Sequence, residues 1–168
     1  MSTVGVLRRA VESDLAAIVV LNEANVTHLS PLTAAALQRL SSYASYFCVA
    51  EIGGALAGFL LAVGSEAPYE GENFLWFKSR YAGFLYVDRI VVGAHARRAG
   101  IASQLYEGLE THARASQASL ITCEINQRPP NPESLAFHER RGFVEVGTRE
   151  VDDGAKSLSM RLKRIRVA

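Results

Sequence analysis

The spacing of apolar positions divides the chain into strands and helices. Short apolar runs rich in β-branched and aromatic residues predict strands over residues 3–10, 46–52, 55–64, 84–92, 119–126, 143–151 and 156–165. Apolar residues at helical spacing predict helices over residues 13–25, 30–43, 101–115 and 133–141. Gly53-Gly54 separates two of the strands and is typical of a hairpin turn. This order predicts a mixed α/β fold with a sheet of about seven strands and about four flanking helices.

Cap residues indicate where the first two helices begin. Ser13 is the expected N-cap of the first helix, and Ser30 is the expected N-cap of the second. Pro31 would then occupy the first helical position, where its missing N–H group is not needed.

Residues 65–82 match neither periodicity, and they contain five aromatic residues. A loop with a short helical turn fits this segment best. Exposed aromatic residues in a loop often cover a binding site, but a packed surface loop is an equally consistent interpretation.

Length and composition narrow the class of protein. At 168 residues the chain is long enough for one domain, residues 1–168, to bury a core without disulfides or metal ions. Its 18 Lys and Arg against 17 Asp and Glu create no global field that would attract nucleic acid or an anionic membrane. Cys48 and Cys123 lie in apolar runs, which favours buried, reduced thiols. No apolar signal segment or membrane span of ~18 residues is found, so we expect a soluble, cytoplasmic protein.

The basic C-terminal segment, residues 157–165, alternates apolar and polar positions. We expect an edge strand with one solvated face rather than an electrostatic tail. Such an edge would be available to pair with a second copy of the chain, which makes a homodimer an open prediction.

The segment AHARRAGIASQL, residues 94–105, joins the strand that ends at Val92 to the next helix. The first turn of a helix offers unpaired N–H groups and the positive end of the helix dipole. Gly100 leaves those amides accessible, and Arg97 and Arg98 add charge suited to phosphate oxygens. The segment therefore predicts a pyrophosphate site, with solvated arginines beside a relaxed turn as the alternative.

Two motifs carry a resemblance to a known family. Arg97, Gly100 and Ala102 have the spacing Q/R-x-x-G-x-G/A, and a later run reads NPESLAFHERRGF. The positions of interest in the later run are Asn131, Ser134, Phe137, His138 and Gly142-Phe143. Together these motifs resemble the GNAT superfamily of acyl-CoA-dependent N-acetyltransferases, including a bacterial subgroup of predicted acetyltransferases. The resemblance implies a mostly antiparallel sheet that is splayed in the middle to admit CoA.

The resemblance implies acetyl-CoA as the cofactor. Its pantetheine arm would bind main-chain groups of Ile90, Val91 and Val92. Its pyrophosphate would bind the amides of Arg97, Arg98, Ala99, Gly100, Ile101 and Ala102. Asn131, Ser134, Phe137 and His138 would complete the cofactor site, although helix capping is the more ordinary interpretation of Asn131.

Acetyl transfer to an amine needs a base for the amine and a proton donor for the departing thiolate. Asp88 is the first candidate base, because strand alternation places it on one face with Tyr86 and a strand-interior carboxylate needs a partner or a role. Glu124 is the alternative base, and a structural ion pair is the alternative role of Asp88. His138 stands where the family usually has a tyrosine, so it is the candidate acid, with Tyr86 and Tyr106 as substitutes. A histidine that is only packed and locally bonded remains the alternative.

The acceptor amine is expected at the first two helices and the aromatic loop. The residues expected to bind it are Asn25, Tyr69, Phe74, Trp76, Tyr81 and Asn126, with Asn22 and His28 near the first helices. The bulky aromatic loop favours a small substrate over a protein substrate.

Taken together, the residues predict an N-acetyltransferase that moves an acetyl group to a primary amine of a small molecule or amino acid by direct attack. A covalent route through Cys123 is not expected, because no activating histidine is recognisable beside it. One alternative is an acyl-CoA-binding sensor or interaction domain that has lost catalysis. Another is a protein N-terminal or lysine acetyltransferase.

Overall fold

The computed structural model describes residues 5–26 and 29–167, which form one seven-stranded sheet in the order β1-β2-β3-β4-β5-β7-β6. The strands are β1 (Val6–Arg9), β2 (Ala44–Ile52), β3 (Ala55–Gly64), β4 (Phe84–Val92), β5 (Leu120–Arg128), β6 (Val144–Val151) and β7 (Lys156–Arg164). The α-helices are α1 (Leu15–Glu23), α2 (Ala34–Tyr43), α3 (Glu72–Lys78), α4 (Ile101–Ala115) and α5 (Pro132–Arg140). Two short 3₁₀ turns are η1 (Glu12–Asp14) and η2 (Ala94–Ala96). Every neighbouring pair is antiparallel except β4 and β5, so the predicted mixed, mostly antiparallel sheet is confirmed.

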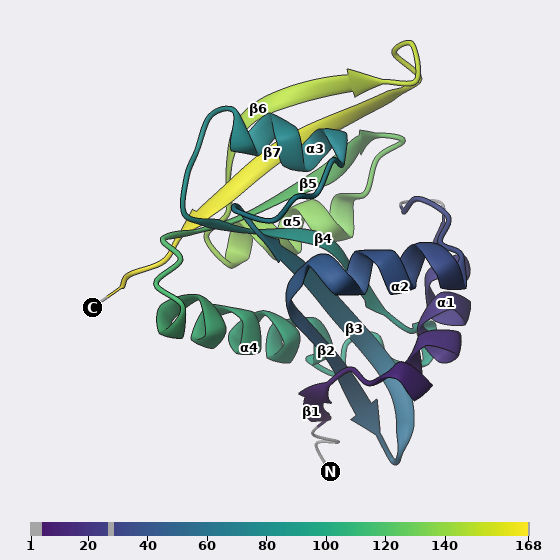
Figure 1. Ribbon diagram of the computed structural model, residues 1–168. Helices are drawn as coiled ribbons and strands as arrows, with labels where there is room; N and C mark the ends of the chain where they lie inside the picture. The colour runs from purple at the N-terminus through teal and green to yellow at the C-terminus, as the bar shows by residue number, and fades with distance from the viewer. Residues whose placement is uncertain (1–4, 27–28, 168) are drawn as a thin grey trace.

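Helices cover both faces of the sheet (Figure 1). Helices α1, α2 and α3 pack on one face, where Phe59 and Leu61 of β3 are fully buried. Helix α4 packs on the other face, against Leu60 and Ala62 of the same strand. Because β3 is buried on both faces, its sequence is a continuous apolar run rather than an alternating one.

Strands β4 and β5 are the only parallel neighbours in the described sheet, and they pair only at their beginnings. Their register consists of Phe84 with Leu120, Leu85 with Ile121 and Tyr86 with Thr122. Both strands continue for six residues beyond this point, and β4 stays paired with β3 on its other side. The strands therefore diverge (Figure 1), and the edge of β4 beyond Tyr86 faces a gap with unpaired main-chain groups.

The first two helices begin later than predicted. Helix α1 begins at Leu15, and Ser13 lies inside the preceding 3₁₀ turn rather than at an N-cap. Helix α2 begins at Ala34 because the Thr33 hydroxyl accepts a hydrogen bond from the Ala36 amide at 3.1 Å. Ser30 and Pro31 consequently lie in the connecting loop. Thr33 rather than Ser30 is therefore the N-cap, and the helix that follows it buries Leu37 and Leu40.

The C-terminal strand is not an edge strand, so this prediction was wrong. Strand β7 pairs with β5 on one side and with β6 on the other, and β6 forms the edge. Pairing on both sides buries Leu158, Met160 and Leu162, and the homodimer contact predicted through this strand has no free edge to use.

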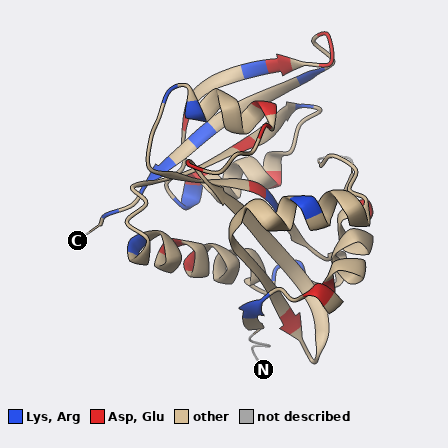
Figure 2. Ribbon diagram, viewed as in Figure 1, with Lys and Arg blue, Asp and Glu red and all other residues tan. Residues whose placement is uncertain are grey.

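Other local predictions agree with the structure. Gly53 and Gly54 form the β2–β3 turn with φ of 59° and 79°, values that suit the primed hairpin turns. Cys48 and Cys123 are buried free thiols. Cationic and anionic residues are interspersed along the same elements in Figure 2. Of the helices in the described ranges, none is long and apolar enough to cross a membrane.

Candidate functional site

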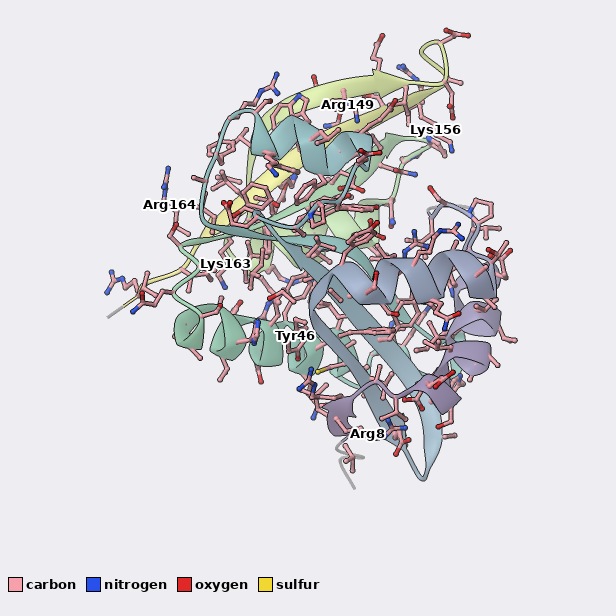
Figure 3. All side chains as sticks on the ribbon, in the orientation of Figure 1. Arg8, Tyr46, Arg149, Lys156, Lys163 and Arg164 are labelled. Atoms are coloured by element: carbon pink, nitrogen blue, oxygen red, sulfur yellow. The ribbon has the colours of Figure 1, made fainter. Side chains whose placement is uncertain are left out.

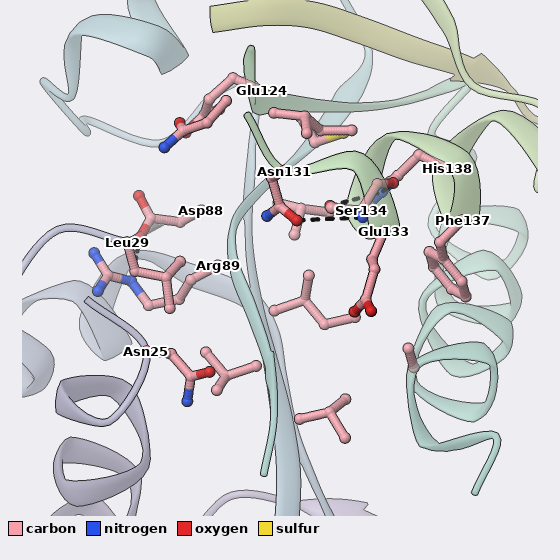
Figure 4. Close-up of a pocket in the computed structure, with 18 of the residues that line it drawn as sticks. Asn25, Leu29, Asp88, Arg89, Glu124, Asn131, Glu133, Ser134, Phe137 and His138 are labelled. Carbon is pink, nitrogen blue, oxygen red and sulfur yellow. Dashed lines mark hydrogen bonds and ion pairs between the residues drawn. The ribbon is translucent and has the colours of Figure 1, made fainter. Parts of the chain in front are cut away.

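A cleft of about 1590 Å³ opens where β4 and β5 diverge. One end is formed by the segment before α4 and the beginning of that helix, and one side by the beginning of α5. The loop after α1 forms the other side (Figure 4), and the opposite end is formed by the beginning of α3 and the β6–β7 hairpin. Figure 4 shows Asp88 and Arg89 on the side of α1, with Asn131, Ser134 and His138 across the gap. Segments distant in the sequence thus meet at the one break in the sheet pairing.

The beginning of α4 has the geometry of an anion site. Gly100 is the N-cap and has a φ of 79°, which favours glycine, while a Cβ there would meet no described atom within 4 Å. The first amides of α4, those of Ile101, Ala102 and Ser103, belong to residues that line the cleft and have no acceptor within the helix. Arg97 and Arg98 line the same end. Glycine is therefore required here by the backbone conformation, and the space beside it is open to a ligand.

The two arginines of this segment differ in conformation. Arg97 donates to the Asn25 side-chain oxygen at 3.3 Å, which connects this end of the cleft to the loop after α1. Arg98 has a φ of 64°, a left-handed conformation that costs a non-glycine residue about 1–2 kcal/mol. A strained residue at a candidate binding segment is consistent with a functional constraint on that backbone.

The long walls of the cleft also match the cofactor residues expected from the sequence. Ile90, Val91 and Val92 line it along the unpaired edge of β4. Across the gap, Asn131 caps α5 by accepting from the Ser134 amide at 3.4 Å, and Phe137 lies one turn further on. Backbone donors and cations at one end, followed by an unpaired strand edge, fit a long ligand with a pyrophosphate and amide groups, as acetyl-CoA has.

A β-bulge at Asp88 changes the faces of β4. Leu61 is opposite Arg89 and Ala62 is opposite Val87, so Asp88 is the extra residue between them. Tyr86 and Asp88 still share one face, as alternation predicts, since Asp88 bonds Tyr69 of the cluster that contains Tyr86. Alternation fails at the next residue, because Arg89 bonds Asp88 and Asn22 on that same face. Tyr86 and Asp88 both line the cleft.

Both oxygens of the Asp88 carboxylate are already engaged. The Tyr69 hydroxyl donates to one oxygen at 2.6 Å, and Arg89 Nε donates to the other at 2.8 Å. Arg89 also donates to the Asn22 side-chain oxygen at 3.0 Å, which fixes the guanidinium against α1. The Asp88 and Arg89 side chains are only 6% and 10% exposed. This geometry is that of the structural ion pair, the alternative to Asp88 as the base.

Glu124 has an environment better suited to a base. The Tyr86 hydroxyl lies 2.9 Å and 2.8 Å from its two carboxylate oxygens. Burial raises the pKa of Glu124 to about 7, the Asp88 charge acts in the same direction, and the hydrogen bond from Tyr86 opposes them. Burial also raises the pKa of Tyr86, so the phenol stays protonated and acts as the donor. A carboxyl with a pKa near 7 can accept and release a proton at neutral pH.

His138 does not fit the role of proton donor. Its Nδ1 lies 2.7 Å from the Ser134 carbonyl oxygen, which can only accept, so Nδ1 carries the hydrogen. Nε2 must then accept from the Tyr106 hydroxyl at 2.7 Å. Burial lowers the pKa of His138 to about 4, so the ring is neutral at physiological pH. The packed and locally bonded histidine is the interpretation that the structure supports.

Three residues predicted to bind the acceptor line the cleft, namely Asn25, Tyr69 and Asn126. His28 lies outside the described residues. The others fill the interior instead. Phe74 is fully buried against Phe84 and Tyr86, and Tyr81 packs against the same core.

Trp76 is likewise structural. A Cβ on Gly147 of β6 would lie 2.6 Å from the indole, so the ring occupies the space above this glycine. The Arg80 guanidinium lies 3.9 Å from the ring centroid on its other side. Phe74, Trp76 and Tyr81 therefore do not line the cleft as expected, because these aromatic residues of α3 and the loop after it pack on the sheet.

The structure adds Arg149 and Lys156, which the sequence did not suggest. Arg149 of β6 donates to the Asn73 side-chain oxygen and to Glu72 at 3.4 Å, and all three line the cleft. Lys156 lines it as well, and pairs with Asp152 at 3.4 Å. Asn73 and Arg149 are 76 positions apart, so no local pattern indicates their contact. Within residues 5–26 and 29–167, no cluster of three or more His, Cys, Asp or Glu could hold a metal ion.

Comparisons with known proteins agree with this geometry. A family model described as the acetyltransferase (GNAT) family matches residues 17–143. Ard1 from Thermoplasma volcanium superposes with a TM-score of 0.80 at 16% identity, covering 97% of this chain and 99% of that one. The ribosomal-protein-S18-alanine N-acetyltransferase from Escherichia coli superposes with a TM-score of 0.75 at 15% identity, covering 98% and 96%. A Salmonella typhimurium protein solved with its cofactor acetyl-CoA gives a TM-score of 0.72 at 17% identity, covering 98% and 95%. No curated protein matches the sequence.

Proposed function

The chain belongs to the GNAT family of acetyltransferases, which use acetyl-CoA, and from this premise we propose that it acetylates the primary amine of a small molecule or amino acid. The amine attacks the thioester carbon directly, so a C–N bond forms and the C–S bond breaks without an acyl-enzyme. Family membership favours an enzyme over a sensor that only binds acyl-CoA. We also propose that residues 1–168 act as one domain, because a single sheet spans the described residues.

The observation that carries this proposal is the position of Glu124 at the divergence of β4 and β5. It follows Thr122, the last residue of β5 that pairs with β4, by two positions and lines the cleft there. A carboxyl with a pKa of about 7 at the break in the sheet is available to take the proton of an attacking ammonium. We therefore assign the base to Glu124, with Tyr86 holding its carboxylate and Asp88 contributing negative charge nearby.

The cofactor residues follow from the two walls of the cleft. The α4 amides with Arg97 and Arg98 would hold the pyrophosphate, and the edge of β4 at Ile90–Val92 would bind the pantetheine amides. Acetyl-CoA supplies the activated acyl carbon. Tyr106 is our candidate hydrogen-bond donor to the departing sulfur, because it lines the cleft; its hydroxyl would exchange its hydrogen bond to His138 for one to the sulfur. Burial raises the pKa of Tyr106, so it would act as a neutral donor.

Calorimetric titration with acetyl-CoA tests the cofactor site. Arg98→Ala should weaken binding about tenfold, which corresponds to the ~1.4 kcal/mol expected for one hydrogen bond to a charged group. Arg114→Ala is the matched control, since Arg114 lies at the far end of the same helix with a side chain 55% exposed. Equal affinity in all three proteins, or no binding at all, would overturn the cofactor site.

Release of CoA in the presence of a panel of amines tests the reaction and its base. Glu124→Gln should lower kcat by about 10²–10⁴, the range for loss of a general base, and should leave the acetyl-CoA Kd unchanged. Asp88→Asn should have the smaller effect on kcat if Asp88 is the structural partner of Arg89. A protein or peptide N-terminus belongs in the panel. Acetylation of that acceptor alone would replace the small-amine proposal by the protein acetyltransferase.

A further inference from the structure

The acceptor end of the cleft carries a second group that the transfer reaction itself does not need. Arg149 reaches from the edge strand β6 toward the beginning of α3, and its side chain is 20% exposed. Figure 3 shows Arg149 beside α3 and Lys156 toward the β6–β7 hairpin. Proton abstraction from an amine calls for a base rather than a second cation, so the proposed proton transfer does not account for this guanidinium.

The known contacts leave this guanidinium incompletely paired. Arginine has five N–H donors, and the contacts to Asn73 and Glu72 use one nitrogen each. The Glu72 side chain is 82% exposed, so its ion pair is screened by solvent and contributes little. Arg89, the other buried cation of the cleft, differs because Asp88, Asn22 and the Ser30 carbonyl all engage it. Of these two arginines, Arg149 is the one with capacity for a ligand.

Asn73 connects Arg149 with the neighbourhood of the base. Its side-chain oxygen accepts from Arg149, all three residues line the same cleft, and Asn73 acts to lower the pKa of the Glu124 carboxyl. The side chain of Asn73 therefore lies close to both the cation and the carboxylate. The amine and carboxylate of an α-amino acid are also separated by a very short covalent path. Such a ligand could place its amine at Glu124 and its carboxylate at Arg149 together.

We infer that the acceptor is a free α-amino acid and that Arg149 recognises its carboxylate. This inference rests on the proposed acetyl transfer and deepens it, since it names the group that must accompany the amine. Arginine is suited to this role because its planar fork binds a carboxylate through two parallel hydrogen bonds. Lys156, at the rim and paired with Asp152, adds positive charge to the same end.

The test compares each L-α-amino acid with its carboxamide as acceptor for acetyl-CoA, which needs no variant. The amine of an amino-acid carboxamide is less basic and more often neutral than that of the free acid. An enzyme that does not bind the carboxylate should therefore have a higher kcat/KM for the carboxamide. We expect at least one free acid to exceed its amide at least tenfold in kcat/KM, as expected for a hydrogen-bonded ion pair. The inference would be overturned if every carboxamide had a kcat/KM equal to or higher than that of its free acid.

Variants of Arg149 then assign the recognition. Arg149→Met should raise KM for the preferred acid at least tenfold, change the amide less than threefold and leave the acetyl-CoA Kd unchanged. Arg149→Lys should recover part of the preference, because a point charge replaces the bidentate fork. Arg164→Met on the neighbouring β7 is the matched control and should change neither acceptor, since Arg164 is exposed and outside the cleft.

The outcomes separate this inference from the proposed function. Acetylation of amines without preference for a carboxylate would overturn the inference and leave the acetyltransferase proposal standing. An equal loss of acid and amide turnover in Arg149→Met would also count against it, because it would indicate that Arg149 only holds α3. Binding of acetyl-CoA without transfer to any amine, acid or amide would overturn both.

Discussion

Replacing Glu124 by Gln should make the protein more stable at pH 8 while removing the proposed base. The folded pKa of Glu124 is raised from 4.5 to about 7, mainly by burial. Below pH ~4.5 the carboxyl is protonated in both the folded and unfolded states and costs no stability. Between pH ~4.5 and ~7 the folded state holds a proton that the unfolded state releases, so the free energy of unfolding falls as the pH rises.

The size of the effect follows from that difference in pKa. At about 1.4 kcal/mol for each pH unit, the ionised Glu124 lowers the free energy of unfolding by roughly 3 kcal/mol above pH ~7. Glutamine keeps an acceptor for the Tyr86 hydroxyl but loses the charge, which costs about 1 kcal/mol. We expect a net gain of about 2 kcal/mol at pH 8, or about 4–8 °C in Tm for a chain of this size.

Thermal denaturation of the wild type and Glu124→Gln at pH 5, 6, 7 and 8 measures this gain. The difference in Tm should be near zero at pH 5 and should grow through pH 7. Glu145→Gln on β6 controls for the loss of a negative charge elsewhere on the sheet, because Glu145 bonds Ser159 and Gln127 outside the cleft. A Glu124→Gln difference that stays constant across the series would refute the raised pKa and, with it, the assignment of the base.

Three further predictions concern local geometry. Gln117 has a φ of 60° in the turn that ends α4, a conformation that glycine adopts more easily. Gln117→Gly should therefore stabilise the protein by about 0.5–1 kcal/mol, measured by urea denaturation. Destabilisation would contradict this left-handed C-terminal cap. Gly147→Ala should destabilise by about 1–3 kcal/mol, since its Cβ would meet Trp76, and Trp76→Leu in the same chain should reduce that cost. If the two substitutions change the free energy of unfolding additively, residue 147 and the Trp76 ring are not in contact. Tyr69→Phe should cost about 1.5–3 kcal/mol of stability, because one oxygen of the Asp88 carboxylate loses its hydrogen bond. The acetyl-CoA affinity should not change. A loss of that affinity would contradict the proposal that the cofactor binds away from Tyr69.

Local patterns predicted most of the fold because most of its elements are defined locally. The β2–β3 hairpin follows from Gly53-Gly54, and α4 follows from a stripe that buries Ile101, Leu105 and Leu109. The position of β7 could not be predicted in this way. Its alternation indicates a strand with two different faces, but alternation carries no information about which neighbours pair with it.

The proposed cofactor end of the site could be suggested from the sequence for the same physical reason. A helix N-terminus with Gly100 at its cap and Arg97 and Arg98 before it is a contiguous segment, so sequence and site coincide. The choice of base could not be predicted, because the bulge at Asp88 brings Arg89 onto the face of Asp88, where the two pair, whereas regular alternation places them on opposite faces. Nothing in the sequence of β4 distinguishes a bulged from a regular strand.

Acceptor recognition is the part of the site least accessible from sequence, and the fold explains why. The proposed pyrophosphate site is one contiguous turn, whereas the proposed acceptor end is assembled from the beginning of α3 and the β6–β7 hairpin. Aromatic residues of α3 indicated a binding loop, yet Phe74 and Phe77 are fully buried because that helix must cover the sheet. The exposed side of the same helix leaves Asn73 to meet Arg149 from a strand 76 positions away. A substitution on the edge strand β6 can therefore change which amine is bound without disturbing the cofactor, and acceptor specificity should vary independently of acetyl-CoA affinity.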